Sequence, residues 1–143
     1  VNETFACRTT RFEVTADGVL TNPFQLTYPG DTFPDGMAFD AEGALWIVCV
    51  ISNRIIRVAP DLTWTVLFED IDRSELEAVA SAYARGCLTW DQISQSRGSC
   101  VSNLSSIAFG GPELNTIYLG GLGIDAVQVL QSPIPGRPMV HWL

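Results

Sequence analysis

The feature that most constrains the fold is a short pattern that the chain repeats. Residues 8–12 (Arg-x-x-Arg-Phe) and 54–58 (Arg-x-x-Arg-Val) share one spacing, lie about 46 residues apart, and both lead into an Asp-containing turn. A third, shorter match at 125–129 follows another apolar segment. An internal period of this length is typical of chains built from stacked copies of one supersecondary unit. The sequence therefore predicts repeated units.

A second pair of segments repeats in the same way. Residues 35–40 (Asp-Gly-Met-Ala-Phe-Asp) match residues 105–110 (Ser-Ser-Ile-Ala-Phe-Gly), and an apolar strand follows each of them, at 45–47 and 117–119. Short antiparallel strands in repeats of this length are typical of a β-propeller, in which each blade is a four-stranded sheet. The predicted fold class is therefore all-β.

The length allows about three such blades, because a blade takes about 45 residues and the chain has 143. Propellers typically close with about four to eight blades, and the first repeat starts at what corresponds to the second or third strand of a blade. We therefore expect residues 1–143 to form one domain that is part of a propeller. Its open ends would be covered by another chain or by a second copy of this one.

The turns between the predicted strands contain aspartates. The clearest turn signal is Ala-Asp-Gly at 16–18, between strands expected at 7–14 and 19–28. Asp17, Asp40 and Asp61 are interpreted as turn formers, because aspartate side chains hydrogen-bond to nearby backbone in turns. Strand parity places these turns at the end of the sheets opposite to Asp35.

Residues 71–103 interrupt the β pattern and are expected to form a helical hairpin. Residues 74–77 (Ser-Glu-Leu-Glu) form a capping-box pattern before apolar residues at helical spacing, and Gly86 supplies a stop. Thr89 and Gln92 form a second capping box. One interpretation is a surface hairpin that packs on the edge of a blade. The other is a lid beside the central mouth, because the insertion leads into Ser105 as another loop leads into Asp35.

Composition and charge exclude some classes of partner. The chain is 47% hydrophobic and 17% charged, which is typical of a globular protein, and its formal net charge is −8. It contains no cluster of Lys and Arg of the kind that a nucleic-acid surface needs. No apolar run reaches the length of about 18 residues that a membrane span requires. Small molecules or metal cations are the expected ligands.

The four cysteines are widely spaced and lack the CxxC pairs of a zinc knuckle. A disulfide between Cys87 and Cys100 would close a short loop and is left open as an alternative. Cys49 lies in an apolar strand, where a thiol behaves as a small hydrophobe. Free thiols suit a reducing compartment, so a cytoplasmic location is expected.

Several motifs in one order resemble the C-terminal half of gluconolactonases, in the family that contains the senescence marker protein (regucalcin) and luciferin-regenerating enzyme. They are Phe-Pro-Asp-Gly-Met-Ala-Phe-Asp-Ala-Glu-Gly-x-Leu-Trp at 33–46, Asn-Arg-x-Ile-Arg-Val at 53–58, Ile-Ala-Phe-Gly-Gly-Pro at 107–112 with Leu114, Thr116 and Tyr118, and Pro-Gly-x-Pro-x-x-His-Trp at 135–142. The resemblance implies a six-bladed propeller with one divalent metal ion on its axis. Calcium, magnesium, zinc and manganese all remain open as its identity.

The family holds this metal with a glutamate, an asparagine and the aspartate of the Pro-Asp-Gly motif, which Asp35 matches. Asp35 is therefore the candidate metal ligand and the candidate catalytic general base, roles that suit a carboxylate. The alternative is a simple turn residue, because Pro-Asp-Gly is a common turn. Asn2 lacks the context of the family's asparagine. The glutamate and asparagine ligands have no match in this sequence.

Other residues near the predicted site have weaker indications. Ser105 matches Asp35 in the repeat and is a candidate substrate-binding residue or a strand cap. The glycines at 120, 121 and 123 either leave room for substrate or allow tight packing. Phe33 is interpreted as a core residue and His141 as a structural residue of a closing strand.

Two functions follow from these observations. The first is a metal-dependent hydrolase that opens a sugar lactone or similar cyclic ester once the propeller is complete. Its partners would be the N-terminal half of the propeller, as a separate chain or cleaved fragment, and a small-molecule lactone. The alternative is a non-catalytic half-propeller that works as a binding or assembly module. Two copies would then close a symmetric ring, because one carboxylate holds a divalent cation poorly.

Overall fold

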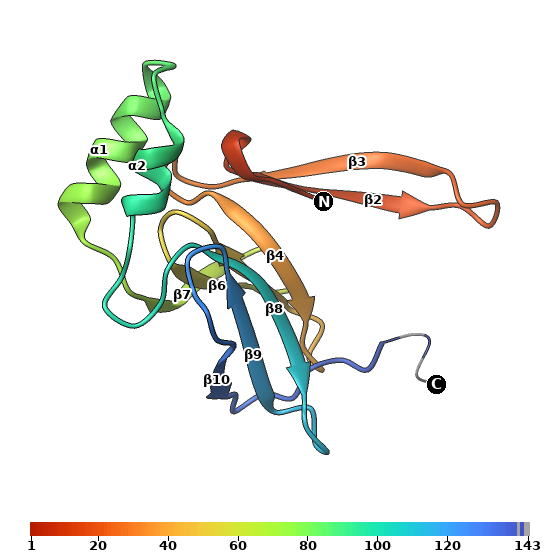
Figure 1. Ribbon diagram of the computed structural model, residues 1–143. Coiled ribbons are helices and arrows are strands. Elements are labelled where there is room, and N and C mark those ends of the chain that lie inside the picture. Colours follow the sequence, from red (N-terminus) through yellow and green to blue (C-terminus); the bar gives the residue numbers. More distant parts are fainter. Residues whose placement is uncertain (140, 142–143) are drawn as a thin grey trace.

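The computed structural model describes residues 1–139 and 141, which form three antiparallel sheets and a helical insertion (Figure 1). The first sheet has the order β1-β2-β3, the second β4-β5-β6-β7 and the third β10-β9-β8. The elements are β1 (Asn2–Glu3), the 3-10 helix η1 (Thr4–Ala6), β2 (Arg8–Val14), β3 (Leu20–Thr27), β4 (Pro34–Phe39), β5 (Leu45–Cys49), β6 (Arg54–Val58), β7 (Trp64–Glu69), α1 (Arg73–Ala84), α2 (Trp90–Gln95), β8 (Leu104–Gly110), β9 (Thr116–Gly121) and β10 (Gln128–Gln131).

The sheet order explains the repeated sequence pattern. Strands β2 and β6 carry the two Arg-x-x-Arg copies, and each lies next to the last strand of its sheet. Strand β10 occupies the third place after β8 and β9, which matches the position of β6 after β4 and β5. The third copy was placed at 125–129, whereas the strand covers Gln128–Gln131. The repeat is therefore confirmed, with a shift of the third copy along the chain.

Two apolar layers hold the sheets together. One lies between β4–β7 and β8–β10, and the other between β1–β3 and β4–β7, where Tyr28 packs its ring against Trp64 at 5.9 Å. The first layer consists of Trp46, Val48, Ile55, Val101, Leu104, Ile107, Phe109, Ile117 and Leu119. Strand β4 contacts both β8 and β1, so the first strands of neighbouring sheets lie together. The fold predicted from sequence is confirmed as a mostly β structure of antiparallel sheets.

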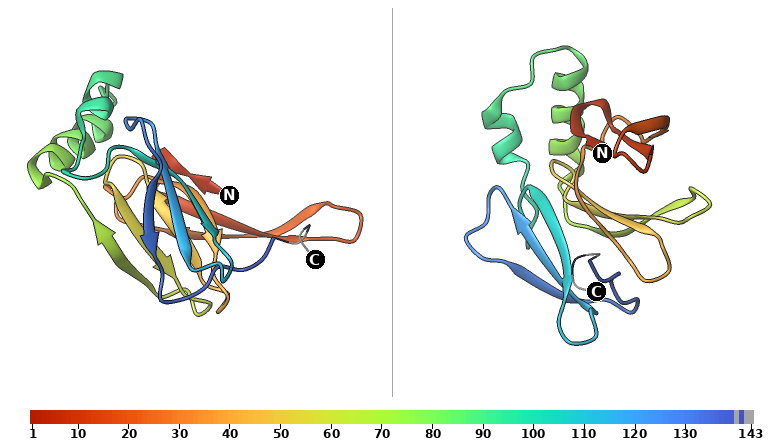
Figure 2. Two further views of the ribbon diagram at one scale, coloured as in Figure 1. Left: turned by 60° about the horizontal axis from the view of Figure 1, so that its bottom comes forward. Right: turned by 90° about the vertical axis from the view of Figure 1, so that its right-hand side faces the viewer.

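The helical insertion stands above one end of the sheets, as the right-hand view of Figure 2 shows. Helix α1 buries Leu76, Val79 and Ala82, and the first two pack with Phe33, the predicted core residue, which is fully buried. The apolar stripe of α1 therefore covers the end of β4 and β5. The helical spacing of the apolar residues predicted a buried face on this helix, and Leu76 and Val79 are part of it.

The caps of the two helices differ from each other in how well the sequence predicted them. Asp72, and not Ser74, is the N-cap of α1, because the Asp72 carboxylate accepts hydrogen bonds from the backbone N–H groups of Ser74 and Glu75. The predicted capping box of α2 is confirmed, with Thr89 as the N-cap and Gln92 as its partner. The prediction of a capping box at 74–77 is wrong. Aspartate is also a strong N-cap, and Asp72 stands two residues before Ser74.

The remaining predictions about cysteines and the C-terminal segment have clear outcomes. Cys87 and Cys100 are free, exposed thiols. Cys49 is buried as predicted, and burial raises the pKa of its thiol to about 12. His141 does not lie in a strand; segment 132–139 contains prolines, which lack the N–H that a sheet ladder needs. Within the described residues, no helix is long and apolar enough to cross a membrane.

Candidate functional site

Asp35 lies in an irregular part of β4, where the chain departs from regular pairing. The register between β4 and β5 shifts between Pro34 and Met37, so Asp35 falls in a bulge. Strand β8 has the same kind of irregularity between Leu104 and Ser106. Bulges re-aim side chains and occur often beside active sites. The two copies of the repeat therefore share a distortion that sequence matching alone did not indicate.

The Asp35 side chain borders a cavity of about 350 Å³ and is only partly exposed. The lining residues are Thr4, Phe5, Asp35, Val50, Ile51, Trp90, Ile93 and Leu122. Desolvation raises the pKa of the Asp35 carboxyl above its ordinary value. Within residues 1–139 and 141, no hydrogen bond or ion pair to this carboxylate compensates for the lost water. Its environment therefore favours uptake of a proton or a cation.

The backbone at Asp35 is held by a residue of β1. Asn2 donates a hydrogen bond from Nδ2 to the Asp35 carbonyl oxygen at 2.6 Å, and its Oδ1 accepts one from Thr9 at 2.6 Å. The Asn2 amide thus joins β1 to β4 through Asp35 and to β2 through Thr9. Asn2 is a positioning residue, a role that the sequence did not reveal because its partners lie far along the chain.

The floor of the cavity is tied to the helical insertion by buried polar side chains. Ser96 donates from Oγ to the Ile51 carbonyl at 2.9 Å, and Asn103 donates from Nδ2 to the Val50 carbonyl at 3.3 Å. Asn103 also donates to the carbonyl of Ile93 on α2 at 2.9 Å. Because these side chains are almost fully buried, the insertion is anchored where it meets the cavity.

A second anchor closes the base of the insertion. The Asp70 carboxylate accepts hydrogen bonds from the backbone N–H groups of Ser99, Cys100 and Val101 at 2.6–2.9 Å. Burial opposes its charge, but these hydrogen bonds outweigh it and lower its pKa to about 2. A Cβ atom on Gly98 would collide with Asp70, so this loop requires glycine. Asp70 thereby joins the two ends of the insertion.

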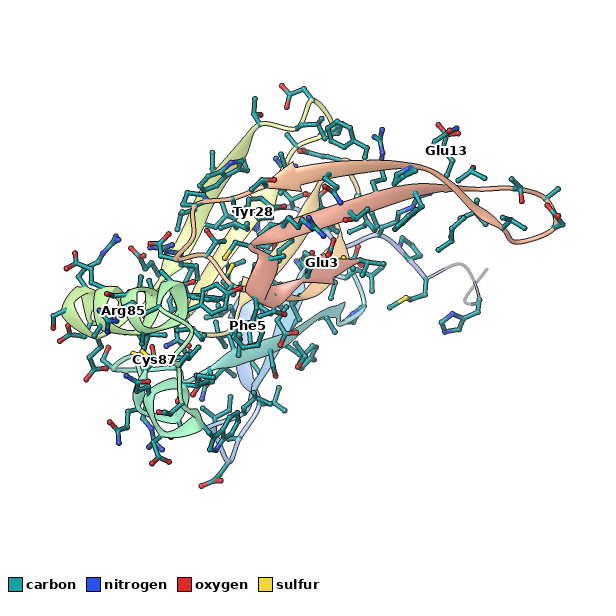
Figure 3. All side chains as sticks on the ribbon, turned by 90° about the horizontal axis from the view of Figure 1, so that it is seen from above. Glu3, Phe5, Glu13, Tyr28, Arg85 and Cys87 are labelled. Carbon is teal, nitrogen blue, oxygen red and sulfur yellow. The ribbon has the colours of Figure 1, made fainter. Side chains whose placement is uncertain are left out.

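Aromatic side chains form the wall of the cavity beside α2. The ring of Phe5 lies 6.2 Å from that of Phe33 and 5.6 Å from that of Tyr83, measured between centroids. The Tyr83 hydroxyl donates to the Phe5 carbonyl oxygen. Figure 3 shows Phe5 between the N-terminal sheet and the helices. Trp90, the first residue of α2, is 65% exposed and lines the same cavity.

The structure brings Ser105 near Asp35 through the backbone. A Cβ atom on Gly36 would lie 2.4 Å from the Ser105 carbonyl oxygen, so glycine is needed where β4 and β8 meet. Ser105 is not among the residues that line the Asp35 cavity. Its role in binding substrate stays a prediction.

The glycines of β9 and the following loop serve packing. A Cβ on Gly120 would lie 2.4 Å from Ser106 Oγ, and one on Gly121 would lie 2.4 Å from the Ser102 carbonyl oxygen. Gly123 stands equally close to the Ser102 side chain. Of the two interpretations, tight packing is therefore the one that the contacts support.

The predicted turn aspartates form turns, and one of them does more. Asp17 and Asp61 each accept a hydrogen bond from a nearby threonine hydroxyl. Asp40 is fully buried, and its Oδ2 accepts hydrogen bonds from Trp46 Nε1 at 2.9 Å and Arg57 Nε at 2.8 Å. The sequence indicated the turn but not this buried ion pair, because Trp46 and Arg57 come from two further strands.

The donor set at Asp35 fits one position of a metal site. A carboxylate oxygen suits hard cations such as Ca²⁺ and Mg²⁺, which take about six or more oxygen ligands. The described part of the chain contains no group of three or more His, Cys, Asp or Glu residues arranged to hold a metal ion. The remaining ligands would therefore come from backbone, water or residues outside the described part.

Comparison with known proteins places the fold of this chain among propeller proteins. No protein-family model matches the chain. The match to luciferin-regenerating enzyme covers 92% of this chain and 40% of that enzyme's chain, with a TM-score of 0.60 and 19% identity. The match to virginiamycin B lyase from Staphylococcus aureus covers 96% of this chain and 36% of the lyase chain, with a TM-score of 0.54 and 17% identity. These likenesses establish the fold, and the chain spans about two fifths of each structure.

A comparison of sequences adds a short match to regucalcin. A stretch of 28 residues is 54% identical to regucalcin from Xenopus laevis; it covers 20% of this chain and 9% of regucalcin. The chain therefore resembles, in sequence and in fold, the family of gluconolactonase, regucalcin and luciferin-regenerating enzyme, as its motifs predicted.

Proposed function

We propose that this chain contributes the Asp35 carboxylate to a metal-dependent hydrolase that opens a lactone or similar cyclic ester. The observation that carries the proposal is the environment of the Asp35 carboxylate. This carboxylate lies at a bulge, borders a cavity, and is partly desolvated without a compensating hydrogen bond from the described residues. A purely structural carboxylate in the same chain, such as Asp70, has every oxygen satisfied.

The chemistry follows from this state. A divalent cation bound at Asp35 would polarise the lactone carbonyl. Asp35, whose carboxylate accepts no hydrogen bond from the described residues, would take a proton from the attacking water as the general base. The water oxygen bonds to the carbonyl carbon, the ring C–O bond breaks, and the leaving alkoxide takes the proton that Asp35 carries, which regenerates the carboxylate. The product is an open-chain hydroxy acid.

Completion of the site requires more chain than residues 1–143 in this proposal. We infer a six-bladed ring in which this chain supplies about three blades, with residues 71–103 as an insertion. Strand β1 covers only the first part of the edge of β2 among the described residues, with pairs at Thr9 and Arg8. The uncovered edge of β2 is suited to a further strand, from an N-terminal half or a second copy. We call the complete particle the assembled protein.

A non-catalytic assembly module is the second candidate. It is favoured by the donor set, because one carboxylate is all that the described part of the chain brings to the cavity. Mass measurement in solution separates the candidates. A heterodimer with an N-terminal fragment supports the split enzyme, a homodimer supports the symmetric ring, and a stable monomer contradicts the need for completion.

The decisive experiment replaces Asp35 by Asn in the assembled protein. We expect metal-dependent lactone hydrolysis to fall roughly a thousandfold, because the base and a metal ligand are lost together. Terbium luminescence sensitised by tryptophan should fall as well, since Trp90 lines the same cavity. The control is Glu113→Gln, which removes an exposed carboxylate from the turn at the far end of β8. Turnover in Asp35→Asn equal to that of the control would sink the assignment.

A further inference from the structure

Another cavity lies beside β6 and β7, the last two strands of the second sheet. It measures about 440 Å³, and its wall is completed by the first residue of α1 and by the segment between β3 and β4. We call it the β6–β7 cavity. It shares no lining residue with the Asp35 cavity. What it binds is therefore independent of the proposed hydrolysis.

Thr32 brings to this cavity a polar group that has no partner. The residue lines the cavity and is only 1% exposed. Its backbone is satisfied, because its N–H donates to the Pro29 carbonyl at 3.1 Å and its carbonyl accepts from Ser52 Oγ at 2.8 Å. Among the described residues, nothing forms a hydrogen bond with its Oγ1. A buried hydroxyl in this state is unfavourable, so a ligand that reaches Thr32 gains a hydrogen bond.

Four charged side chains form one row of ion pairs along the cavity. Arg54 donates to Asp31 at 2.9 Å and to Glu69 at 2.5 Å, and Glu69 also accepts from Arg73 at 2.5 Å. All four residues line the cavity. The inner members, Arg54 and Glu69, are thus paired on both sides. The terminal members, Asp31 and Arg73, are each paired on one side.

The two ends of this row keep hydrogen-bonding capacity of opposite charge. Within residues 1–139 and 141, no group donates to Asp31 Oδ1, and Arg73 Nε and Nη1 donate to no acceptor. Thr32 directly follows Asp31 in the chain, so the unpartnered hydroxyl belongs to the acidic end. The β6–β7 cavity therefore has an acidic end at Asp31 and a basic end at Arg73.

Apolar side chains line the rest of the cavity. They are Pro29, Ile56, Trp64 and Val66. The Trp64 ring is held edge-to-face against Tyr28, with the centroids 5.9 Å apart. Methylene groups of a ligand gain free energy when they leave water for such a surface. The face of an indole also attracts an ammonium group.

We propose that the β6–β7 cavity binds a zwitterion whose ammonium and carboxylate groups are joined by a short methylene chain, as in an ω-amino acid. The ammonium donates to Asp31 and to Thr32 Oγ1, and the carboxylate accepts from Arg73. The methylene groups cover the apolar side chains between them. A ligand with a single charge uses only one end of the cavity, because the inner charges of the row already pair with each other.

The test is isothermal titration calorimetry of the assembled protein with ε-aminocaproate. Hexylamine and hexanoate are the controls, since each has a similar chain but only one of the two charges. We expect saturable binding of ε-aminocaproate that is about tenfold tighter than that of either control, because both ends of the cavity contribute. Equal affinities for the three ligands, or no binding of ε-aminocaproate, would overturn the proposal.

Two variants assign the ends of the ligand. Arg73 is 66% exposed, so Arg73→Gln leaves the core intact. It should weaken ε-aminocaproate about fivefold and leave hexylamine unchanged, because hexylamine lacks the carboxylate. Thr32→Val keeps the shape of the side chain and should weaken both ligands about fivefold. Its Tm should not fall, because the lost hydroxyl had no partner among the described residues.

Arg85→Gln is the matched control for Arg73→Gln. It removes an exposed arginine at the other end of α1, outside the cavity lining, and should change neither affinity. Losses in Arg73→Gln that equal those in Arg85→Gln, or that are the same for ε-aminocaproate and hexylamine, would overturn the assigned site. These measurements follow binding alone, so they stand or fall without lactone hydrolysis.

Discussion

The two ends of β4 carry the same chemical group in opposite environments. At one end, Asp35 borders a cavity, and desolvation raises its pKa. At the other end, Asp40 is fully buried; burial opposes its charge, but hydrogen bonds from Trp46 and Arg57 outweigh this cost, so its pKa lies below the ordinary value. Both acids are removed from water to some degree, but among the described residues only Asp40 gains hydrogen-bond donors to its carboxylate.

The difference separates a carboxylate that holds the fold from one that is available for chemistry. Asp40 joins the turn after β4 to β5 and β6, so its charge is used within the protein. Asp35 loses solvent and gains no hydrogen bond within the described part of the chain. Such an arrangement is unfavourable for stability and is typical of sites that bind a cation or transfer a proton.

The largest expected effect on stability comes from Asp40. Asp40→Asn should lower the free energy of unfolding by about 3 kcal/mol, because it leaves Arg57 without its buried anion. Urea unfolding at neutral pH measures this loss. The control is Glu42→Gln, which removes the exposed partner of the same arginine and should cost less than about 1 kcal/mol. Equal losses in the two variants would contradict the assignment of Asp40 as the structural acid.

A smaller loss is expected at Asp70. Asp70→Ala should cost about 2 kcal/mol, since it removes charge-assisted hydrogen bonds to a partly exposed loop. The pKa of Asp70 is lowered from 3.8 to about 2, so its contribution is present above about pH 4 and disappears as the pH falls toward 2. Unfolding at a series of pH values should show the variant and wild type converging in that window. A constant difference down to pH 2 would disprove the role of its charge.

The cap of α2 comes next. Thr89→Ala should lower stability by about 1 kcal/mol, because the capping box loses its hydroxyl. Thr89→Ser keeps that hydroxyl and should restore most of the stability in thermal unfolding. If the two variants unfold alike, the capping box does not fix the helix that carries Trp90.

The smallest effect has the opposite sign and falls on Asp35. Asp35→Asn should raise the free energy of unfolding at pH 7 by roughly 0.5 kcal/mol, because a desolvated charge is removed. Since the folded pKa is raised, the wild type loses stability as the pH rises above 3.8, and the gain in the variant should shrink as the pH returns toward that value. Millimolar Ca²⁺ should stabilise the wild type of the assembled protein and leave Asp35→Asn unchanged. If Asp35→Asn lowered the stability instead, Asp35 would have a structural role like that of Asp40.

Much of the fold was accessible from the sequence because strands and helices follow local patterns. The Arg-x-x-Arg repeats lie on equivalent strands, and the stripe of Leu76 and Val79 forms the buried face of α1. The predicted element boundaries were wrong where two or more local signals compete. Asp72 and Ser74 are both good caps, and the sequence did not rank them. The segment before β10 offers several turn residues, the glycines at 120, 121 and 123 and Asp125, and the sequence did not rank these either.

The candidate site was less accessible. The motif identified Asp35, but nothing local indicated that Asn2 would hold its backbone or that Trp90 would share its cavity. The contact of Gly36 with the Ser105 backbone also joins residues far apart in the chain. Short motifs carry chemistry, whereas the surroundings of a motif depend on segments that meet only after folding.

The sequence by itself determined the repeat, the mostly β class, the resemblance to the gluconolactonase family and the position of its characteristic aspartate. Only the tertiary structure decided which aspartate is satisfied and which is not. A carboxylate's state depends on water removed and donors supplied, and here both come from other strands and from α2. Asp35 and Asp40 lie five residues apart, on β4 and in the turn after it. They differ in role for this reason: Asp40 is suited to hold the fold, and Asp35 to bind a cation or transfer a proton.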